Sequence, residues 1–175
     1  MDPLLSIWQA RQSLSVSEDT RWKSLSFLLR TYATVEPPPL HLVTSVRAIM
    51  LGQGTVMVVR DPHGRHILPG GRREPGEALL ATLARELREE TGWQASDPRL
   101  IGVRHFHHRD PMPAGYPYPY PDFLQLVYAA RLDAIDPAGR EPDGFELEAT
   151  LMPVEDARAL PLSPGERLLL DAARS

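Results

Sequence analysis

The sequence predicts an α/β protein in which helices cover a mixed β-sheet. Runs of aliphatic and β-branched residues, bounded by turn residues, recur between residues 41 and 152, as strands do. Apolar residues at helical spacing precede, interrupt and follow those runs. The chain of 175 residues suits one compact domain, and its 42% hydrophobic and 24% charged residues lie near the globular average. Strands flanked by helices are typical of a mixed sheet with helices packed on its faces.

Residues 1–39 are predicted to form an N-terminal helical extension that ends in a proline-rich connector. Leu4, Leu5 and Trp8 begin a short amphipathic helix, and Ser17 is a suitable N-cap for a second one. The apolar residues of the second helix recur at helical spacing: Trp22, Leu25, Leu28, Leu29 and Tyr32. The three prolines after residue 36 end this helix, because proline lacks the amide hydrogen. We expect the extension to lie outside the main sheet and to cover the domain or pair with a second copy in a homodimer.

The main domain is expected over residues 40–175, with strands before and after one prominent helix. The turn 52–54 separates two strands that read as a hairpin. The prominent helix closes at Gly92, since glycine favours the left-handed conformation that ends a helix. The expected strands are 41–51, 55–60, 66–68, 100–107, 123–132 and 147–152, and the expected helices are 77–91, 154–160 and 164–174.

Composition and charge exclude several classes of protein. The chain has no cysteine, which excludes a disulfide framework, zinc–thiolate sites and cysteine nucleophiles. Its net charge of −4 argues against a nucleic-acid polymer as partner. No apolar run approaches the roughly 20 residues of a membrane span, and the N-terminus lacks the cationic start of a signal peptide. We therefore expect a cytoplasmic protein with no membrane partner.

The prominent helix carries three carboxylates on one side. At 100° per residue, Glu86, Glu89 and Glu90 fall within an arc of about 100°, next to an apolar stripe. Like charges this close repel, and each raises the pKa of its neighbours, so the pattern favours a hard divalent cation among the oxygens. Mg²⁺ and Mn²⁺ suit such ligands, and Arg85 can orient one carboxylate. An ordinary solvated helix face is the alternative for these glutamates taken alone.

The spacing from the diglycine to the end of the helix is more specific. Five residues separate Gly71 from Glu77, and seven more separate Glu77 from the segment 85–93, which reads RELREETGW. This resembles the Nudix box of the Nudix hydrolase superfamily at every defined position. Seven fixed residues at about 7% usage each would coincide at a given start with a frequency on the order of 10⁻⁸.

This resemblance implies an α/β/α sandwich, with residues 40–175 as a Nudix hydrolase domain. It implies a hydrolase that uses Mg²⁺ or Mn²⁺ to cleave a pyrophosphate bond in a nucleoside diphosphate linked to another group. It also implies metal ligands on the loop and helix: Glu86, Glu89, Glu90 and the Gly71 carbonyl. Glu89 is the first candidate for activating the attacking water, while Glu77 and Arg85 resemble the pair that braces the loop against the helix.

A different class of function is a Nudix-fold module that binds nucleotides or regulates without turnover. Such modules usually lose carboxylates of the box, and all four are present here. The isomerase branch of the fold relies on a cysteine, which this chain lacks. The substrate fingerprints of the coenzyme A, NADH and ADP-ribose branches do not match well. Nucleoside di- or triphosphates are therefore the first expectation for the substrate, and sugar nucleotides the second.

Candidates for substrate contact lie on two loops outside the helix. Arg72 and Arg73 directly follow the diglycine and can face phosphates as bidentate donors, although solvated loop arginines are commoner. Tyr116, Tyr118 and Tyr120 alternate with prolines in the loop 111–122. Their rings can stack on a nucleobase, or they can pack on the protein surface.

Two further groups have a functional and a structural interpretation. Glu148, and with less support Glu146, can reach back to the metal or can lie on an exposed strand edge. His105 and His107 share one face of a predicted strand, so a metal site there is conceivable. No third ligand occurs at a suitable spacing, and we expect these histidines to lie on the sheet surface or to line the substrate pocket.

Overall fold

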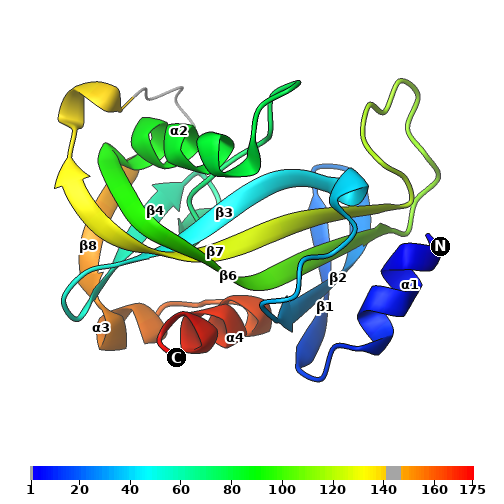
Figure 1. Ribbon diagram of the computed structural model, residues 1–175, viewed down its shortest axis with the longest axis horizontal. Coiled ribbons are helices and arrows are strands. Elements are labelled where there is room, and N and C mark those ends of the chain that lie inside the picture. The colour runs from blue at the N-terminus through cyan, green and yellow to red at the C-terminus, as the bar shows by residue number, and fades with distance from the viewer. Residues whose placement is uncertain (1, 141–146) are drawn as a thin grey trace.

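The computed structural model describes residues 2–140 and 147–175, and these form one mixed sheet covered by helices (Figure 1). The strands are β1 (Ser15–Trp22), β2 (Leu25–Ala33), β3 (Val43–Leu51), β4 (Thr55–Asp61), β5 (Gly64–His66), β6 (Trp93–His108), β7 (Asp122–Ile135) and β8 (Glu148–Pro153). Their order is β1-β2-β6-β7-β3-β4-β5, with β8 paired to β4. Only β3 and β7, among the described strands, pair in parallel. The predicted mixed α/β fold is confirmed.

The helices lie on both sides of this sheet. They are α1 (Pro3–Ala10), α2 (Leu79–Thr91), α3 (Val154–Arg158) and α4 (Pro164–Ala173). Figure 1 shows α2 on one side of the central strands and α3 and α4 on the other. No helix in the described parts of the chain combines the length and apolar character needed to cross a membrane.

Two apolar clusters, one on each face of the sheet, hold these layers together. Strand residues alternate between the faces, so Val46 on β3 packs toward α2 while Ile49 packs toward α4. Leu83 and Leu87 project from one side of α2 into the first cluster, and Leu169 of α4 fills the second. Because α2 buries these leucines, its carboxylates lie on another side of the helix, toward the loop that holds Gly70 and Gly71.

The helix α2 ends where the sequence predicts. Gly92 has φ 72, in the left-handed region, and its amide donates to the Arg88 carbonyl at 2.9 Å. Glycine is favoured there because a Cβ makes this conformation costly. Other boundaries shift modestly, since the strand expected over 66–68 lies at β5 and the one expected from residue 100 begins at Trp93.

The helix predicted after Ser17 is wrong, because residues 15–33 form the hairpin β1–β2. Its buried side chains Phe27, Leu29 and Thr31 recur every second residue, which is strand spacing. A two-residue turn joins the strands, with Lys23 at φ 55. β2 pairs with β6, from Phe27 opposite His108 to Ala33 opposite Gly102. The N-terminal extension is therefore helical only over α1, and its hairpin belongs to the sheet.

The apolar stripe of the extension packs largely within the chain. Leu5 and Trp8 of α1 are buried, and the Trp8 ring meets the Tyr32 ring edge-on at 5.1 Å. Leu29 is also buried, whereas Trp22 at the hairpin turn is exposed. The stripe thus covers the domain, and the homodimer stays a prediction.

Candidate functional site

Arg85 lies at the centre of a cluster of carboxylates on α2 and on the loop before it. Its Nε and Nη2 donate to the two oxygens of Glu77 at 2.9 and 3.0 Å. Its Nη1 donates to Glu86 at 2.9 Å and to Glu89 at 3.1 Å. One guanidinium therefore contacts three carboxylates, and it fixes their orientation through a bidentate bond on one side and a shared nitrogen on the other.

Glu77 anchors the loop that precedes α2. Besides Arg85, it accepts hydrogen bonds from the Thr82 hydroxyl at 2.8 Å and the Glu74 amide at 3.1 Å. The hydrogen bonds from Arg85, helped by those of Glu74 and Thr82, lower the pKa of Glu77 to about 2, although partial desolvation opposes them. Glu77 and Arg85 are thus brought together as a brace between loop and helix.

The low pKa of Glu77 makes a prediction about acid unfolding. A carboxyl whose folded pKa is depressed stabilises the protein above its unfolded pKa, near 4.5, and this stabilisation is lost as the pH falls toward 2. Glu77→Gln should therefore lower the melting temperature at pH 7 and flatten its fall between pH 5 and 2. Thermal melts at several pH values measure this, with the exposed neighbour Glu74→Gln as the control. Parallel curves for parent and Glu77→Gln would show that the brace contributes nothing to stability.

Glu86 lies against the diglycine loop. A Cβ added to Gly71 would overlap the Glu86 carboxylate, so a larger residue here would force that carboxylate out of its position. The Glu86 side chain is 15% exposed. Burial raises the pKa of Glu86, and the neighbouring Arg85 offsets only part of that rise. An anion that is costly to keep ionised here gains from a nearby cation.

Glu90 is the most buried carboxylate of the three, with its side chain 11% exposed. It accepts a hydrogen bond from the Gly70 amide at 2.7 Å, and the Arg47 guanidinium on β3 lies 3.9 Å away. The loop itself is pinned to β3, since the Gly71 carbonyl accepts from the Val46 amide at 3.0 Å. The loop and the helix are thus held in a fixed relation around the carboxylates.

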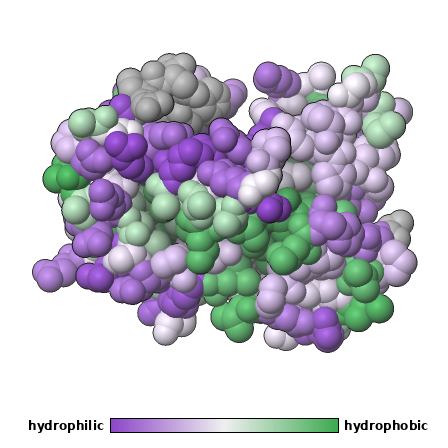
Figure 2. All heavy atoms as spheres, turned by 45° about the horizontal axis from the view of Figure 1, so that its top comes forward, coloured by the Kyte–Doolittle hydropathy of each residue, from purple (hydrophilic) through white to green (hydrophobic). Residues whose placement is uncertain are grey.

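The candidate metal ligands of this site are all oxygen atoms. Glu86, Glu89 and Glu90 supply carboxylates, and the Gly71 carbonyl keeps a second lone pair beside its bond to Val46. Figure 2 shows hydrophilic residues gathered on the side of the molecule where α2 lies. An all-oxygen set of this kind fits Mg²⁺ or Mn²⁺ better than softer metals.

The structure brings Arg72 and Tyr118 together. The Arg72 guanidinium carbon lies 4.4 Å from the centre of the Tyr118 ring and 5.0 Å from that of Trp22, and its Nη1 donates to the Tyr118 hydroxyl. Sequence reasoning missed Trp22 as a neighbour of the diglycine loop, because it placed that residue on a packing helix. Arg73 is exposed, and its Nε donates to the carbonyl of Glu77.

The other candidates for substrate contact have partners elsewhere. The Tyr116 hydroxyl lies 2.9 Å from His108 Nε2, and the two rings meet edge-on. Glu148 forms an ion pair with Arg60 of β4 at 3.0 Å. Tyr120 donates to the Asp110 carbonyl at 3.0 Å. Glu146 lies outside the described residues.

The two histidines of β6 have a partner that the sequence did not reveal. His105 is fully buried and does not lie on the sheet surface. Asp122, the first residue of β7, lies opposite His107 in the strand register and contacts both imidazoles. The missing signal was strand pairing, because the third residue follows His107 by 15 positions and is no local neighbour in sequence.

Several known proteins are similar to this chain in sequence. A family model for the NUDIX domain matches residues 40–173. Human 8-oxo-dGDP phosphatase NUDT18 is 29% identical over 129 residues, which cover 67% of this chain and 36% of that protein. The chain thus spans about a third of this relative's length. The uncharacterized Nudix hydrolase YvcI of Bacillus subtilis (strain 168) is 27% identical over 132 residues, which cover 75% of this chain and 78% of that protein.

A solved structure shares the fold. The NUDIX hydrolase from Nitrosomonas europaea superposes with a TM-score of 0.57 at 21% identity, and the match covers 75% of this chain and 87% of that chain. The common part is the curled mixed sheet with its helices.

Proposed function

The chain belongs to the Nudix hydrolase family, and from this we propose that it is a divalent-metal-dependent hydrolase that cleaves a pyrophosphate bond in a nucleoside diphosphate linked to another group. The observation that carries the proposal is the cluster of carboxylates around Arg85, with Glu86 packed on Gly71 and Glu90 bound to the Gly70 amide. A solvated helix face has no need of a diglycine loop fitted against its glutamates.

Glu86, Glu89 and Glu90 would hold Mg²⁺ or Mn²⁺, with the Gly71 carbonyl as a fourth ligand. A cation bound there would neutralise phosphate charge and polarise a P–O bond. Arg85 keeps Glu86 and Glu89 aligned through its single Nη1. The Glu77–Arg85 brace keeps the helix in register with the loop, so that ligands from both remain together.

Glu89 is the proposed base. Its side chain is 29% exposed, more than Glu86 or Glu90. Arg85 holds its Oε2, and its Oε1 forms no hydrogen bond among the described residues. That oxygen can take a proton from a water as the water's oxygen bonds to phosphorus and the bridging P–O bond breaks. The products are a nucleoside phosphate and the phosphorylated remainder of the substrate.

The Arg72 stack is the proposed contact for substrate phosphate. The rings of Trp22 and Tyr118 contact the Arg72 guanidinium. One guanidinium nitrogen donates to the Tyr118 hydroxyl, and the others can donate hydrogen bonds to a phosphate. Tyr118 is thereby engaged with an arginine. Arg73, Tyr116 and Glu148 stay predictions as substrate contacts.

A substrate panel tests the proposal. Nucleoside di- and triphosphates and sugar nucleotides are offered to the purified chain. The panel includes 8-oxo-dGDP, because the human relative is named an 8-oxo-dGDP phosphatase. At least one compound should be hydrolysed when Mg²⁺ or Mn²⁺ is present, and EDTA should abolish the activity until the metal is restored. Full activity in EDTA would contradict the metal site. Binding of a nucleotide without turnover under every metal condition would favour a silent binding module instead.

A further inference from the structure

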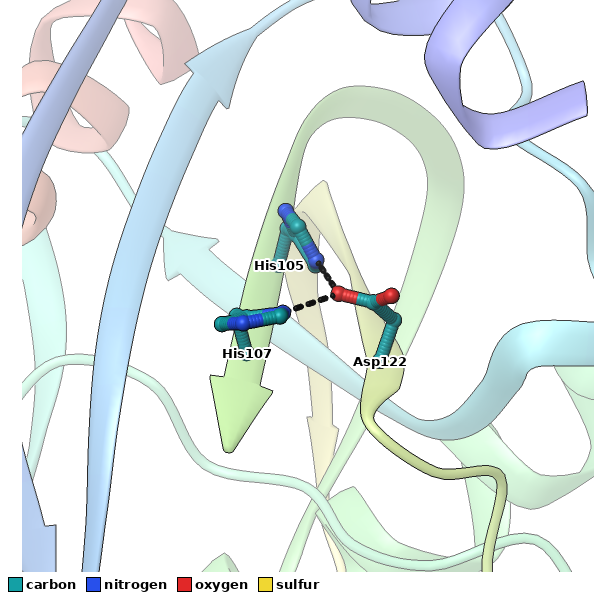
Figure 3. A group of neighbouring side chains, drawn as sticks. All are labelled: His105, His107 and Asp122. Carbon is teal, nitrogen blue, oxygen red and sulfur yellow. Dashed lines mark hydrogen bonds and ion pairs between the residues drawn. The ribbon is translucent and has the colours of Figure 1, made fainter. Parts of the chain in front are cut away.

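A second cluster of metal-ligating side chains lies across β6 and β7. His105 and His107 are two residues apart on β6, so both imidazoles leave the same face of the strand. Asp122 lies opposite His107 at the start of β7. Figure 3 shows both rings directed at the Asp122 carboxylate. One ligand atom from each of the three residues can be chosen so that all lie within 4.8 Å of one another.

The Asp122 carboxylate is buried, and only one of its two oxygens has hydrogen-bond partners among the described residues. The Asp122 side chain is 3% exposed, and its Oδ1 lies 2.7 Å from His105 Nε2 and 2.8 Å from His107 Nδ1. Its Oδ2 is buried and has no hydrogen-bond partner among the described residues. A buried anionic oxygen without a partner is costly, and a cation would remove that cost.

The ring of His105 is held from its far side. Gln9 of α1 places its amide nitrogen 2.9 Å from His105 Nδ1 and 2.9 Å from the Tyr32 hydroxyl. Turning this amide by 180° presents Oε1 to a protonated Nδ1, and the Tyr32 hydroxyl can donate to the same oxygen. His105 Nε2 is then free of its proton and able to bind a metal. Metal-bound histidines usually have such a partner on the second nitrogen.

We propose that His105, His107 and Asp122 bind a late first-row divalent cation, with Zn²⁺ the ion best matched to two imidazoles and one carboxylate. Three protein ligands leave one tetrahedral position for water. The His107 side chain is 34% exposed, so water could reach a cation from that side, whereas His105 is fully buried. The donor set differs from the all-oxygen carboxylates on α2, so the two centres select different metals. This site does not rest on the proposed hydrolase activity.

A cation here would join parts of the chain that are distant in sequence. It would link β6 to β7 directly, and through Gln9 and Tyr32 it would tie α1 and β2 to the same point. The alternative is a triad of hydrogen bonds that holds β6 and β7 without metal. The two differ in whether Zn²⁺ binds and stabilises the fold.

The test uses the metal-free full-length protein with Zn²⁺ alone, followed by Co²⁺ as a spectroscopic probe. Zn²⁺ should bind with one ion assigned to this site and should raise the melting temperature. Co²⁺ should give the strong visible absorption of a four-coordinate site with imidazole ligands, which six-coordinate oxygen sites lack. His107→Asn and Asp122→Asn should each weaken Zn²⁺ binding by at least about 100-fold, and Gln9→Ala by about 10- to 100-fold.

Two controls separate this site from other metal-binding groups. His41→Asn removes a histidine whose ion pair with Asp2, at 2.8 Å, contains a single imidazole. This variant should leave the Co²⁺ spectrum unchanged. Glu90→Gln alters the α2 centre and should also leave it unchanged. If Asp122→Asn fails to fold, His107→Asn decides alone, since its side chain is partly exposed. Equal Zn²⁺ affinity and equal spectra for the parent and His107→Asn would overturn the proposal and leave the hydrogen-bonded triad.

Discussion

Replacing Glu89 or Glu90 by Gln is expected to lower turnover by about 10²- to 10⁴-fold while the protein stays folded. Both substitutions keep the size of the side chain and remove one negative charge. In Glu90→Gln the new side-chain amide oxygen can still accept from the Gly70 amide, so the loop keeps its contact with the helix. Loss of one like charge from a repulsive cluster should leave the melting temperature of the metal-free protein unchanged or raise it.

The two variants should differ in their response to Mg²⁺. Glu90 is deeply placed and bound to the loop, which suits a metal ligand, so Glu90→Gln should need far more Mg²⁺ and recover part of its activity at high concentration. Glu89 is more exposed and has an oxygen without a hydrogen bond among the described residues, which suits a mixed role as ligand and base. Glu89→Gln should therefore stay slow when Mg²⁺ saturates. Activity against Mg²⁺ concentration, measured for each variant, separates the roles.

A matched control is Glu155→Gln, which removes a helical carboxylate whose side chain is 75% exposed. It should leave both turnover and the Mg²⁺ dependence at the parent's values. The assignment would be wrong if the Glu89 and Glu90 variants melted much lower than the parent while their folded fraction kept normal turnover. The glutamates would then stabilise the helix and take no part in the chemistry.

Deletion of residues 1–39 is expected to leave the remaining chain unable to fold. The deleted segment supplies five buried apolar side chains to the core: Leu5, Trp8, Phe27, Leu29 and Tyr32. Burying each is worth about 1.5–3 kcal/mol, and their loss exposes the core side chains that they cover, whereas a typical domain is stable by only about 5–15 kcal/mol. The deletion also removes the partner strand of β6 from Phe27 to Ala33.

Circular dichroism and thermal melts of the truncated chain measure this effect. A graded pair of point variants avoids the all-or-none outcome. Leu29→Ala should cost about 2–5 kcal/mol because it leaves a cavity in the core, whereas Ile7→Ala, at a residue 57% exposed, should cost little. A truncated protein that unfolds cooperatively near the parent's melting temperature would show that the hairpin is an independent appendage, as the sequence alone suggested.

Local features were the ones that sequence reasoning predicted well. The helix that carries the carboxylates, its end at Gly92 and the turn between β3 and β4 depend on neighbours a few residues apart. The candidate ligands Glu86, Glu89 and Glu90 share one helix face for the same reason, and the structure holds two of them on one arginine nitrogen.

The features that sequence reasoning missed depend on distant pairing. Residues 25–32 satisfy two periods at once, since Leu25, Leu28 and Leu29 recur at helical spacing while Phe27, Leu29 and Thr31 recur at strand spacing. The strand period wins because β6 supplies a hydrogen-bonding partner that no local window contains. Asp122 was missed beside His105 for the same reason, because the pairing of β6 with β7 brings them together.

The pairing of β2 with β6 also sets an order of events during synthesis. Phe27 pairs with His108, about 80 residues later in the chain. At about 5–20 residues per second, translation needs about 4–16 s to produce that partner. For those seconds Phe27 and Leu29 of the first hairpin lack the strand that pairs with β2. During that interval the edge of β2 that later pairs with β6 is open to pairing with a strand of another molecule.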